Sequence, residues 1–212
     1  MVDDHAILRL SLARQINGFD ECIVTMQANN GSEFISNLAL NEPPDVVLLD
    51  LNMPVMDGYE TAVHLKEHFP KIKVLMLTMF DSELILIRLL QANVKGFLKK
   101  DIEPSELKFA IHSVMKSDFY YSSHTIGRLA NLLRSSNAKD SVQLKNATLN
   151  DQEVCFLKLA STDLTYKEIA QRMNLTPRMV DALRDQLFLK MNVKSRVGLA
   201  MVAIRNGIVN LN

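Results

Sequence analysis

The sequence predicts an α/β protein with a doubly wound parallel sheet, followed by a second, smaller all-α domain. Short apolar runs alternate with helix-period segments over the first 120 residues, and a wholly helical pattern occupies residues 148–212. Charge divides the chain in the same way: residues 1–121 hold 11 Lys and Arg against 17 Asp and Glu, whereas residues 146–212 hold nine against six. We therefore expect two units with different partners.

Four apolar runs predict strands covered on both faces, because several are apolar at successive residues. They lie at 21–28, 45–51, 73–80 and 96–100. The helix-period segments lie at 5–17, 32–41, 57–69, 82–93 and 104–117. This alternation favours right-handed crossovers and a five-stranded parallel sheet. Only Met1 and Val2 precede Asp3, and a strand usually has about five residues, so the first strand is either clipped or a stub.

The rear of the chain carries clear helix-end signals. Thr165 and Glu168 have the spacing of a capping box, and Thr176 stands before Pro177, a favourable first helical residue. Helices are predicted at about 150–161, 166–173, 177–191 and 196–205. The second and third are joined by the tight turn "NLT", which makes a helix-turn-helix with 177–191 in the recognition position.

Residues 122–147 are rich in Ser, Asn and Lys and predict a linker, with a helical turn or two in its first half. The predicted domains are therefore 1–121 and 148–212. The N-terminal "MVDDHAIL" is acidic and polar, unlike a secretory signal, and no apolar run approaches the roughly 18 residues that cross a bilayer. Cys22 and Cys155 are too few for a disulfide framework or a metal cluster. We expect a cytoplasmic protein with no membrane partner.

The stretch "VVLLDLNMPVMDG" (46–58) ends an apolar strand in Asp50, which costs stability unless the charge is compensated. Asp50, Thr78 and Lys100 lie at or near the ends of three successive strands, and Asp3 and Asp4 follow the first. Carboxyl ends of parallel strands meet at one edge, so these five side chains should converge. Clustered carboxylates favour Mg²⁺, and a Lys and a Thr complete a cradle for a phosphoryl group, with Asp50 as the nucleophile.

Each of these residues also has a simpler interpretation. Asp3 or Asp4 alone is more often a helix cap, Thr78 alone is strand filler, and Lys100 alone is a solvated strand end. Asp57 is expected to cap the helix that begins near Gly58. The site is favoured because its parts occur together and in order.

The Asp-Asp pair, "LLDLNMPVMDG", "LTMF" and "GFLKKD" resemble the receiver domain of bacterial two-component response regulators. The segment "LNDQEVCFLKLASTDLTYKEIAQRMNLTPRMVDALRDQLFLKMNVKSRVGLAMVAIRNGIV" is similar to the LuxR/NarL-type DNA-binding domain. The resemblance implies a flavodoxin-like receiver with Asp50 as phospho-acceptor. It assigns Thr78 and Lys100 to the phosphoryl group, and Thr78 and Phe97 to the switch. The implied Mg²⁺ ligands are Asp3, Asp4, Asp50 and the Asn52 carbonyl.

Two positions depart from the family pattern. Phe97 lacks the hydroxyl of a Tyr, so a switch there would act by packing alone. Asp101 follows Lys100 where many receivers have Pro, although the LuxR/NarL group commonly does the same.

The predicted recognition helix carries acidic residues on its solvent face. Asp181 and Asp185 stand where relatives often have lysine or another polar donor, and Arg184 lies on the flank. The carboxylates could accept from cytosine amino groups in the major groove, or simply pair with Arg178 and Arg184 as a solvated face. Both interpretations stay open. Four basic residues near helix starts are expected to meet the DNA backbone: Lys167, Arg178, Lys194 and Arg196.

These features predict a transcription regulator, not an enzyme. A sensor histidine kinase would phosphorylate Asp50, and a homodimer would then bind double-stranded DNA. The helix 196–205 would supply the dimer face through Leu199, Val202 and Ala203, or pack these residues in its own core.

Two rival functions remain open at this point. A metal-dependent phosphohydrolase would have a second Asp where Asn52 stands, and Asn cannot act as that general acid. A phosphorylation-independent or protein-interaction regulator is the other, since the first strand is weak and the recognition face acidic.

Overall fold

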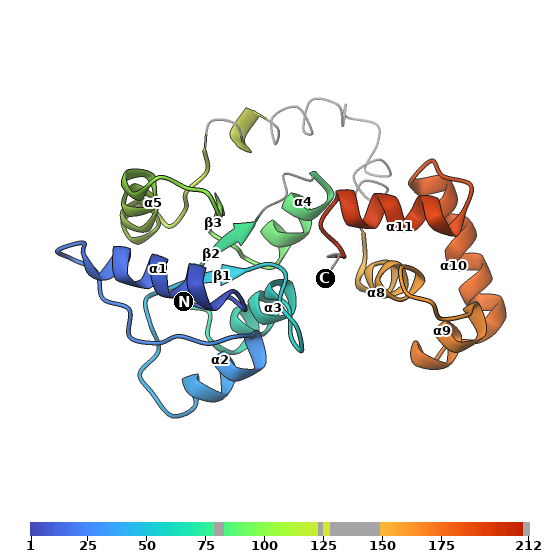
Figure 1. The fold of residues 1–212 in the computed structure, drawn as a ribbon, viewed down its shortest axis with the longest axis horizontal. Helices are drawn as coiled ribbons and strands as arrows, with labels where there is room; N and C mark the ends of the chain where they lie inside the picture. Colours follow the sequence, from blue (N-terminus) through green and yellow to red (C-terminus); the bar gives the residue numbers. More distant parts are fainter. Residues whose placement is uncertain (79–82, 123–124, 128–148, 210–212) are drawn as a thin grey trace. The chain divides into compact units, whose positions relative to one another are not determined.

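The computed structural model describes residues 1–78, 83–122, 125–127 and 149–209 of the 212-residue chain. The chain forms two compact units, which are described separately (Figure 1). The first contains a sheet with helices around it, and the second contains helices alone. Most of the predicted linker 122–147 lies outside the described residues; within it, residues 125–127 are helical.

The first unit contains a parallel sheet of three strands in the order β1 (Val46–Asp50), β2 (Lys73–Thr78) and β3 (Gly96–Lys99). Asp50 is in register with Leu77, and Thr78 with Lys99, so the strand ends share one edge. The helices of this unit are α1 (Ala6–Asn17), α2 (Gly31–Leu38), α3 (Gly58–His68) and α5 (Pro104–Ser117). Helix α4 (Glu83–Gln91) is divided between the two units, which separate after Arg88. The predicted α/β class with a parallel sheet is confirmed.

Residues Met1–Asp3 lie alongside β1 in the direction of a parallel strand. Val2 N donates to Leu48 O at 2.9 Å, and Asp50 N donates to Val2 O at 2.8 Å. On the other side, Ala28 N donates to Met1 O at 3.1 Å. The prediction of a strand over 21–28 is wrong, since only Ala28 forms a bridge there. The amino group of Met1 also donates to Met26 O at 2.9 Å.

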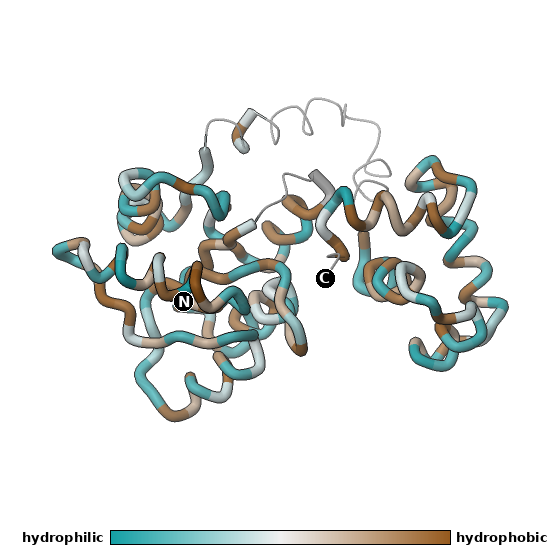
Figure 2. Tube along the Cα trace, viewed as in Figure 1, coloured by the Kyte–Doolittle hydropathy of each residue, from teal (hydrophilic) through white to brown (hydrophobic). Residues whose placement is uncertain are grey.

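Side chains alternate across the sheet and separate two layers of helices. Leu48, Leu75 and Leu98 face α1 and α5, which contribute Leu12 and Leu107 to the same core cluster. Helices α2 and α3 lie on the other side of the sheet (Figure 1). Burial on both faces explains why the strands are hydrophobic at successive residues, as Figure 2 shows.

The second unit consists of α8 (Asp151–Ala160), α9 (Tyr166–Arg172), α10 (Pro177–Lys190) and α11 (Arg196–Arg205). Each end lies within one residue of its predicted position. Thr165 and Glu168 form the expected capping box at α9, and Thr176 accepts from Met179 N at the start of α10. Asn174 takes a left-handed conformation (φ 52°) in the α9–α10 turn, which completes the helix-turn-helix.

The core of this unit gathers apolar side chains from all four helices. Phe156 of α8, Ile169 of α9, Leu187 of α10 and Leu199 of α11 are fully buried in one cluster. Ala203, on the same side of α11 as Leu199, is buried with them. Of the apolar side of α11 named in the sequence prediction, Leu199 and Ala203 therefore pack in the core of their own unit, and Val202 is half-buried.

Both cysteines are free thiols; Cys22 is half-buried and Cys155 is exposed. Among the described residues, no helix has the length and apolar character needed to span a bilayer.

Candidate functional site

The carboxyl ends of the strands hold a compact ionic cluster. Asp3 is 0% exposed and Asp50 2% exposed, so both carboxylates lie inside the unit. The ammonium nitrogen of Lys100 lies 2.7 Å from Asp50 Oδ2 and 3.0 Å from Asp3 Oδ2. Thr78, also buried, ends β2 next to the strand that carries Asp50. The structure thus brings Asp3, Asp50 and Lys100 into direct contact at the edge where they were expected.

Backbone geometry holds the chain that follows Asp50 close to the strand end. Gly58 N donates to Leu51 O at 2.9 Å, and a Cβ at Gly58 would lie 2.1 Å from Asp50 O. No residue with a side chain fits there without a backbone shift. Asp57 caps α3, as expected, through a capping box with Glu60. This return of the chain places the start of α3 directly beneath the Asp50 backbone.

Burial and charge act in opposite directions on Asp50. Burial raises the pKa of its carboxyl to about 6, and the Asp3 carboxylate adds to that rise, while the hydrogen bond and the charge of Lys100 oppose it. For Lys100, burial favours the neutral amine, but contacts with Asp50 and Asp3 outweigh it and raise the pKa of the ammonium group. At neutral pH the site therefore holds a charged lysine and an ionised Asp50.

His5 belongs to the acidic cluster and was missed from the sequence. Its backbone N donates to Asp3 Oδ1 at 2.8 Å, and its Nδ1 lies 2.9 Å from Asp4 Oδ1. One ligand atom from each of Asp3, Asp4, His5 and Asp50 lies within 4.8 Å of the others. The run "DDH" was the available signal, because consecutive residues after a strand end lie close to the same edge.

The donor set fits a hard divalent cation. Asp3, Asp4 and Asp50 supply carboxylate oxygens, which suit Mg²⁺. Lys100 contacts the carboxylates of Asp3 and Asp50, while Asp4 lies beside them with His5. The Arg9 guanidinium donates to the backbone carbonyl of Asp3. Asn52 N lies 3.4 Å from Asp50 Oδ1, so the segment that carries the Asn52 carbonyl also borders the pocket.

Phe97 lies on β3 and is 6% exposed. Its ring stacks on the ring of Tyr121, with 5.8 Å between the centroids. The ring of Phe119 also stacks on Tyr121, with 5.9 Å between the centroids. Tyr121 was not singled out from the sequence. Its contact could not be read from the pattern, because it depends on how the segment after α5 returns to β3.

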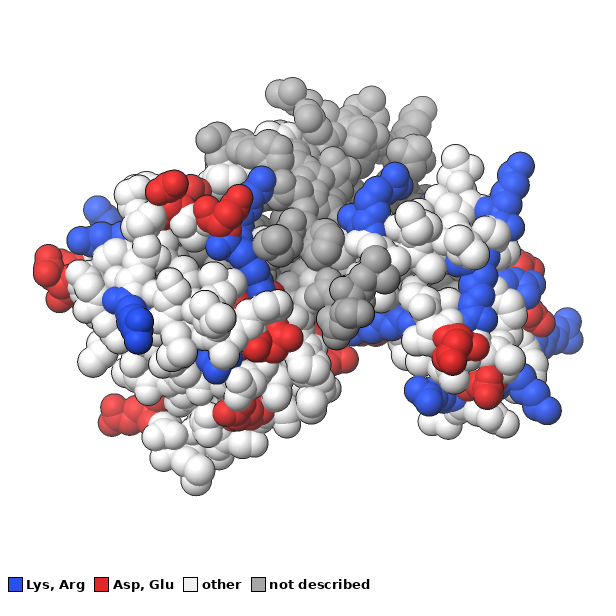
Figure 3. Space-filling view, in the orientation of Figure 1, with Lys and Arg blue, Asp and Glu red and all other residues white. Residues whose placement is uncertain are grey.

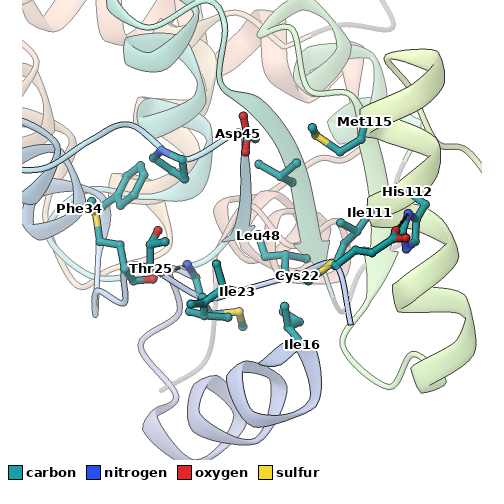
Figure 4. Close-up of a pocket in the computed structure, with 16 residues that line it drawn as sticks. Ile16, Cys22, Ile23, Thr25, Phe34, Asp45, Leu48, Ile111, His112 and Met115 are labelled. Carbon is teal, nitrogen blue, oxygen red and sulfur yellow. Dashed lines mark hydrogen bonds and ion pairs between the residues drawn. The ribbon is translucent and has the colours of Figure 1, made fainter. Parts of the chain in front are cut away.

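A separate cavity of about 370 Å³ opens at the amino end of β1 (Figure 4). Residues of the 22–26 and 45–48 segments line it, together with Met1. Ile16 of α1 and Ile111 of α5 also contribute to its walls. It contains none of the predicted site residues.

Four basic residues predicted to meet nucleic acid lie at helix starts or turns of the second unit. Lys167, Arg178 and Lys194 are exposed. Arg196 is half-buried, and its guanidinium donates to Ala160 O at 2.8 Å and to Thr162 O at 2.7 Å. These bonds tie α11 to the end of α8.

The solvent side of α10 carries an ion-pair cluster. Arg184 contacts Asp181 at 2.8 Å and Asp185 at 2.9 Å, while Val180, Leu183 and Leu187 are buried on the opposite side. Figure 3 shows Lys and Arg interspersed with Asp and Glu on the visible face of this unit. The surface is therefore of mixed charge on that face.

Comparisons with known proteins give a family match for each unit. The family "Response regulator receiver domain" matches residues 1–112, and "Bacterial regulatory proteins, luxR family" matches residues 147–203. The nitrate/nitrite response regulator protein NarL of Escherichia coli (strain K12) is 31% identical over 95% of this chain and 92% of its own length. The response regulator UvrY of the same strain is 28% identical over 99% of this chain and 94% of its own length.

Solved structures show the same fold. RcsB from Salmonella enterica serovar Typhimurium, bound to promoter rprA in the presence of phosphomimetic BeF3−, matches with a TM-score of 0.69 at 22% identity, covering 94% of each chain. The response regulator ChrA of a heme-sensing two-component system matches with a TM-score of 0.51 at 22% identity, covering 98% of this chain and 96% of that one.

Proposed function

Because the chain belongs to the two-component response regulators with a LuxR-type DNA-binding domain, we propose that phosphorylation of Asp50 controls its activity as a transcription regulator. The observation that carries this proposal is the contact of Lys100 with both Asp50 and Asp3. A sensor histidine kinase is the phosphoryl donor that a receiver implies, and double-stranded DNA in the cytoplasm is the target.

The Asp50 carboxylate is the nucleophile of the proposed reaction. One of its oxygens attacks phosphorus, the phosphorus–nitrogen bond to the donor histidine breaks, and an aspartyl phosphate forms. Lys100 Nζ lies 2.7 Å from Asp50 Oδ2, from where it would contact the phosphoryl oxygens and stabilise their negative charge. The Thr78 hydroxyl, at the neighbouring strand end, is assigned to another phosphoryl oxygen.

Asp3, Asp4 and Asp50, with the Asn52 carbonyl, would hold Mg²⁺. The ion would offset the charge that develops on the phosphoryl oxygens. His5, which contacts both Asp3 and Asp4, would orient these two carboxylates.

The proposed switch runs from Thr78 to Phe97. Phosphorylation adds about two negative charges beside Thr78. A shift of the Thr78 hydroxyl toward the phosphoryl group would change the packing of Phe97 against Tyr121, and with it the surface of α4 and β3. Dimerisation or domain release would follow.

We propose that the receiver sheet is five-stranded, with residues 1–3 beside β1 and residues 26–28 beside residues 1–3. Bridges from Val2 to Leu49 and to Ala28, both parallel, support this arrangement. Hydrogen exchange tests it, since the amides of Asp50 and Ala28, which donate to Val2 and Met1, would be protected as strand amides are.

In the DNA-binding unit, α10 is the proposed recognition helix. Lys167, Arg178 and Lys194 would contact phosphates, Arg196 would fix the α8–α11 junction beside them, and Asp181, Arg184 and Asp185 would face the bases. A dimer would set two copies of α10 on half-sites roughly 34 Å apart. Leu199 and Ala203 are buried, so the dimer face of α11 would instead use the exposed Val197 and Met201.

Acetyl phosphate with Mg²⁺ followed by intact-mass measurement tests the acceptor. Wild type should gain one phosphoryl group and Asp50→Ala none. Asp45→Asn, immediately before β1, should behave as wild type. An adduct that persists in Asp50→Ala would overturn Asp50 as acceptor. Wild type that gains none would favour the phosphorylation-independent regulator. Multiple turnover of a generic phosphate ester would instead favour a phosphohydrolase.

DNA binding is tested by a salt titration. Phosphate contacts release counterions, so affinity should fall steeply as salt rises. A slope near zero would mean that Lys167, Arg178 and Lys194 make no phosphate contacts.

A further inference from the structure

The guanidinium of Arg184 bridges two carboxylates of the recognition helix α10. Its Nη1 donates to Asp181 Oδ1 at 2.8 Å, and its Nε donates to Asp185 Oδ1 at 2.9 Å. Nη2 also lies 2.9 Å from Asp185 Oδ1. One planar group therefore fixes two acidic side chains that stand four positions apart on the same helix.

Aromatic rings hold the guanidinium from beneath. Its central carbon lies 5.2 Å from the centroid of the Tyr166 ring, at the start of α9, and 6.0 Å from that of Phe188. The Arg184 side chain is 24% exposed, against 53% for Asp181 and 63% for Asp185. The arginine thus forms the floor of the cluster and the two carboxylates form its outer surface.

The cluster lies on the solvent side of α10. Successive residues of a helix are separated by 100°, which places Asp185 in line with exposed Arg178, Ala182 and Leu189. Val180, Leu183 and Leu187 are buried on the other side. In the helix-turn-helix arrangement, this solvent side is the one that enters the major groove.

We propose that Arg184 is a specificity-determining positioning residue, which orients Asp181 and Asp185 to accept hydrogen bonds from cytosine amino groups. The inference rests on the proposed DNA-binding function of α10. In the major groove, the cytosine N4 amino group is a donor that a carboxylate can accept from. The contacts with Arg184 use Oδ1 of each carboxylate, so Oδ2 of each is the acceptor offered to the base.

The charge of Arg184 also matters for approach to DNA. Two carboxylates one helical turn apart repel each other and repel the phosphates on either side of the groove. The guanidinium offsets one of the two charges and restricts the rotamers of both side chains. Cytosine recognition therefore needs Arg184 as well as Asp181 and Asp185. Removing the acidic charge alone would ease the approach to DNA but would not create a cytosine preference.

The test is a selection of binding sites from randomised duplex DNA with the full chain, treated with acetyl phosphate and Mg²⁺. The wild type should enrich cytosine at one or two positions of each half-site. Asp185→Asn and Asp181→Asn should each move one of those positions from cytosine toward adenine, since an Asn side chain pairs with adenine N6 and N7. Discrimination for cytosine at that position should fall roughly tenfold.

Arg184→Lys retains the positive charge but lacks the planar fork, so cytosine preference should weaken at both positions together. Arg184→Ala should remove most of it. The matched control is Asp163→Asn, which removes an exposed carboxylate outside α10 and should leave base preference unchanged. Circular dichroism of each variant checks that helix content is retained.

Two outcomes would overturn the inference. If Asp181→Asn and Asp185→Asn bind all duplexes more tightly with an unchanged base preference, the cluster is only a solvated ion pair. If the wild type enriches duplexes but has no cytosine preference that the Asp181, Arg184 or Asp185 variants alter, the inference fails while the proposed DNA binding stands. A wild type that enriches no duplex at all would overturn the proposed DNA-binding function and this inference with it.

Discussion

Lys100 Nζ lies 2.7 Å from Asp50 Oδ2, and this ion pair is almost completely enclosed, with the Lys100 side chain 9% and the Asp50 side chain 3% exposed. Asp3 shares the same ammonium group at 3.0 Å. A lone buried carboxylate is costly, so the lysine stabilises two acids at once. The pocket is therefore a structural feature of the receiver as well as its proposed reactive site.

Replacement of Lys100 by Met should strongly destabilise the protein in the absence of Mg²⁺. The change leaves Asp3 and Asp50 buried with no positive partner, and breaking a buried pair in this way costs about 3–5 kcal/mol. Urea unfolding measures the loss. Lys99→Met, at the exposed neighbouring residue, is the matched control and should lose far less. Equal losses in the two variants would show that the buried pair has no special role.

The pKa of Asp50 predicts a pH dependence of stability without Mg²⁺. The carboxyl has a pKa of about 6 when folded and an ordinary value of 3.8, so the folded state keeps this proton longer. As pH rises from about 4 to about 6, the unfolded state releases the proton first and stability falls. The contribution is about 3 kcal/mol.

The comparison with Asp50→Asn isolates that contribution. The variant has no carboxyl at this position, so its stability should fall less than that of wild type between pH 4 and pH 6. Unfolding by urea at several pH values provides the measurement. Parallel curves for the two proteins would contradict the raised pKa.

Substitution of Gly58 by Ala should disturb the site through the backbone. The added Cβ would lie 2.1 Å from Asp50 O and 2.8 Å from the Leu51 Cα, and neither backbone atom can move freely. The expected loss is about 1–3 kcal/mol in stability, with slower phosphorylation of Asp50. Thermal unfolding and intact-mass kinetics measure the two effects. Gly127→Ala is the control, because within the described part of the chain no atom beyond its immediate chain neighbours lies within 4 Å of its Cβ position.

In the second unit, Lys190 and Glu153 form a buried pair between α10 and α8. Lys190 Nζ lies 2.7 Å from Glu153 Oε2, and Glu153 is 6% exposed. Lys190→Met should cost at most about 3–5 kcal/mol, because it leaves the Glu153 carboxylate buried without its cationic partner. The Asn150 N–H still donates to Glu153 Oε2 at 2.8 Å. The double variant with Glu153→Gln should recover part of this loss. A double-mutant cycle of unfolding free energies with no coupling energy between Lys190 and Glu153 would contradict a stabilising role for this ion pair.

Much of the fold follows from local signals. Thr165 and Thr176 begin helices where the capping patterns place them, since a side-chain oxygen there satisfies an exposed backbone N–H. The prediction of a strand over 21–28 was wrong because strand formation depends on contacts with a distant segment of the chain. Its residues are apolar enough for a strand, but a strand also needs a bonded neighbour, and the bonds to this segment from Met1–Asp3 reach Met26 and Ala28.

The sequence left two interpretations of Asp181 and Asp185 open, and the structure supplies the contact that bears on them. Arg184 engages both acids and rests on Tyr166, a residue of another helix. Residue spacing along α10 placed Arg184 near the acids. It could not show the aromatic floor that holds the guanidinium, because that depends on how α9 crosses α10.

By itself, the sequence determined the order of elements, the two kinds of unit and the residue types at the strand ends, because hydrophobic period, caps and turns act over a few neighbouring positions. Only the tertiary structure decided that one ammonium group serves both Asp3 and Asp50, that His5 joins the acids, and that Leu199 and Ala203 are core residues. These facts depend on distances between segments far apart in the chain, which packing sets and local pattern does not encode.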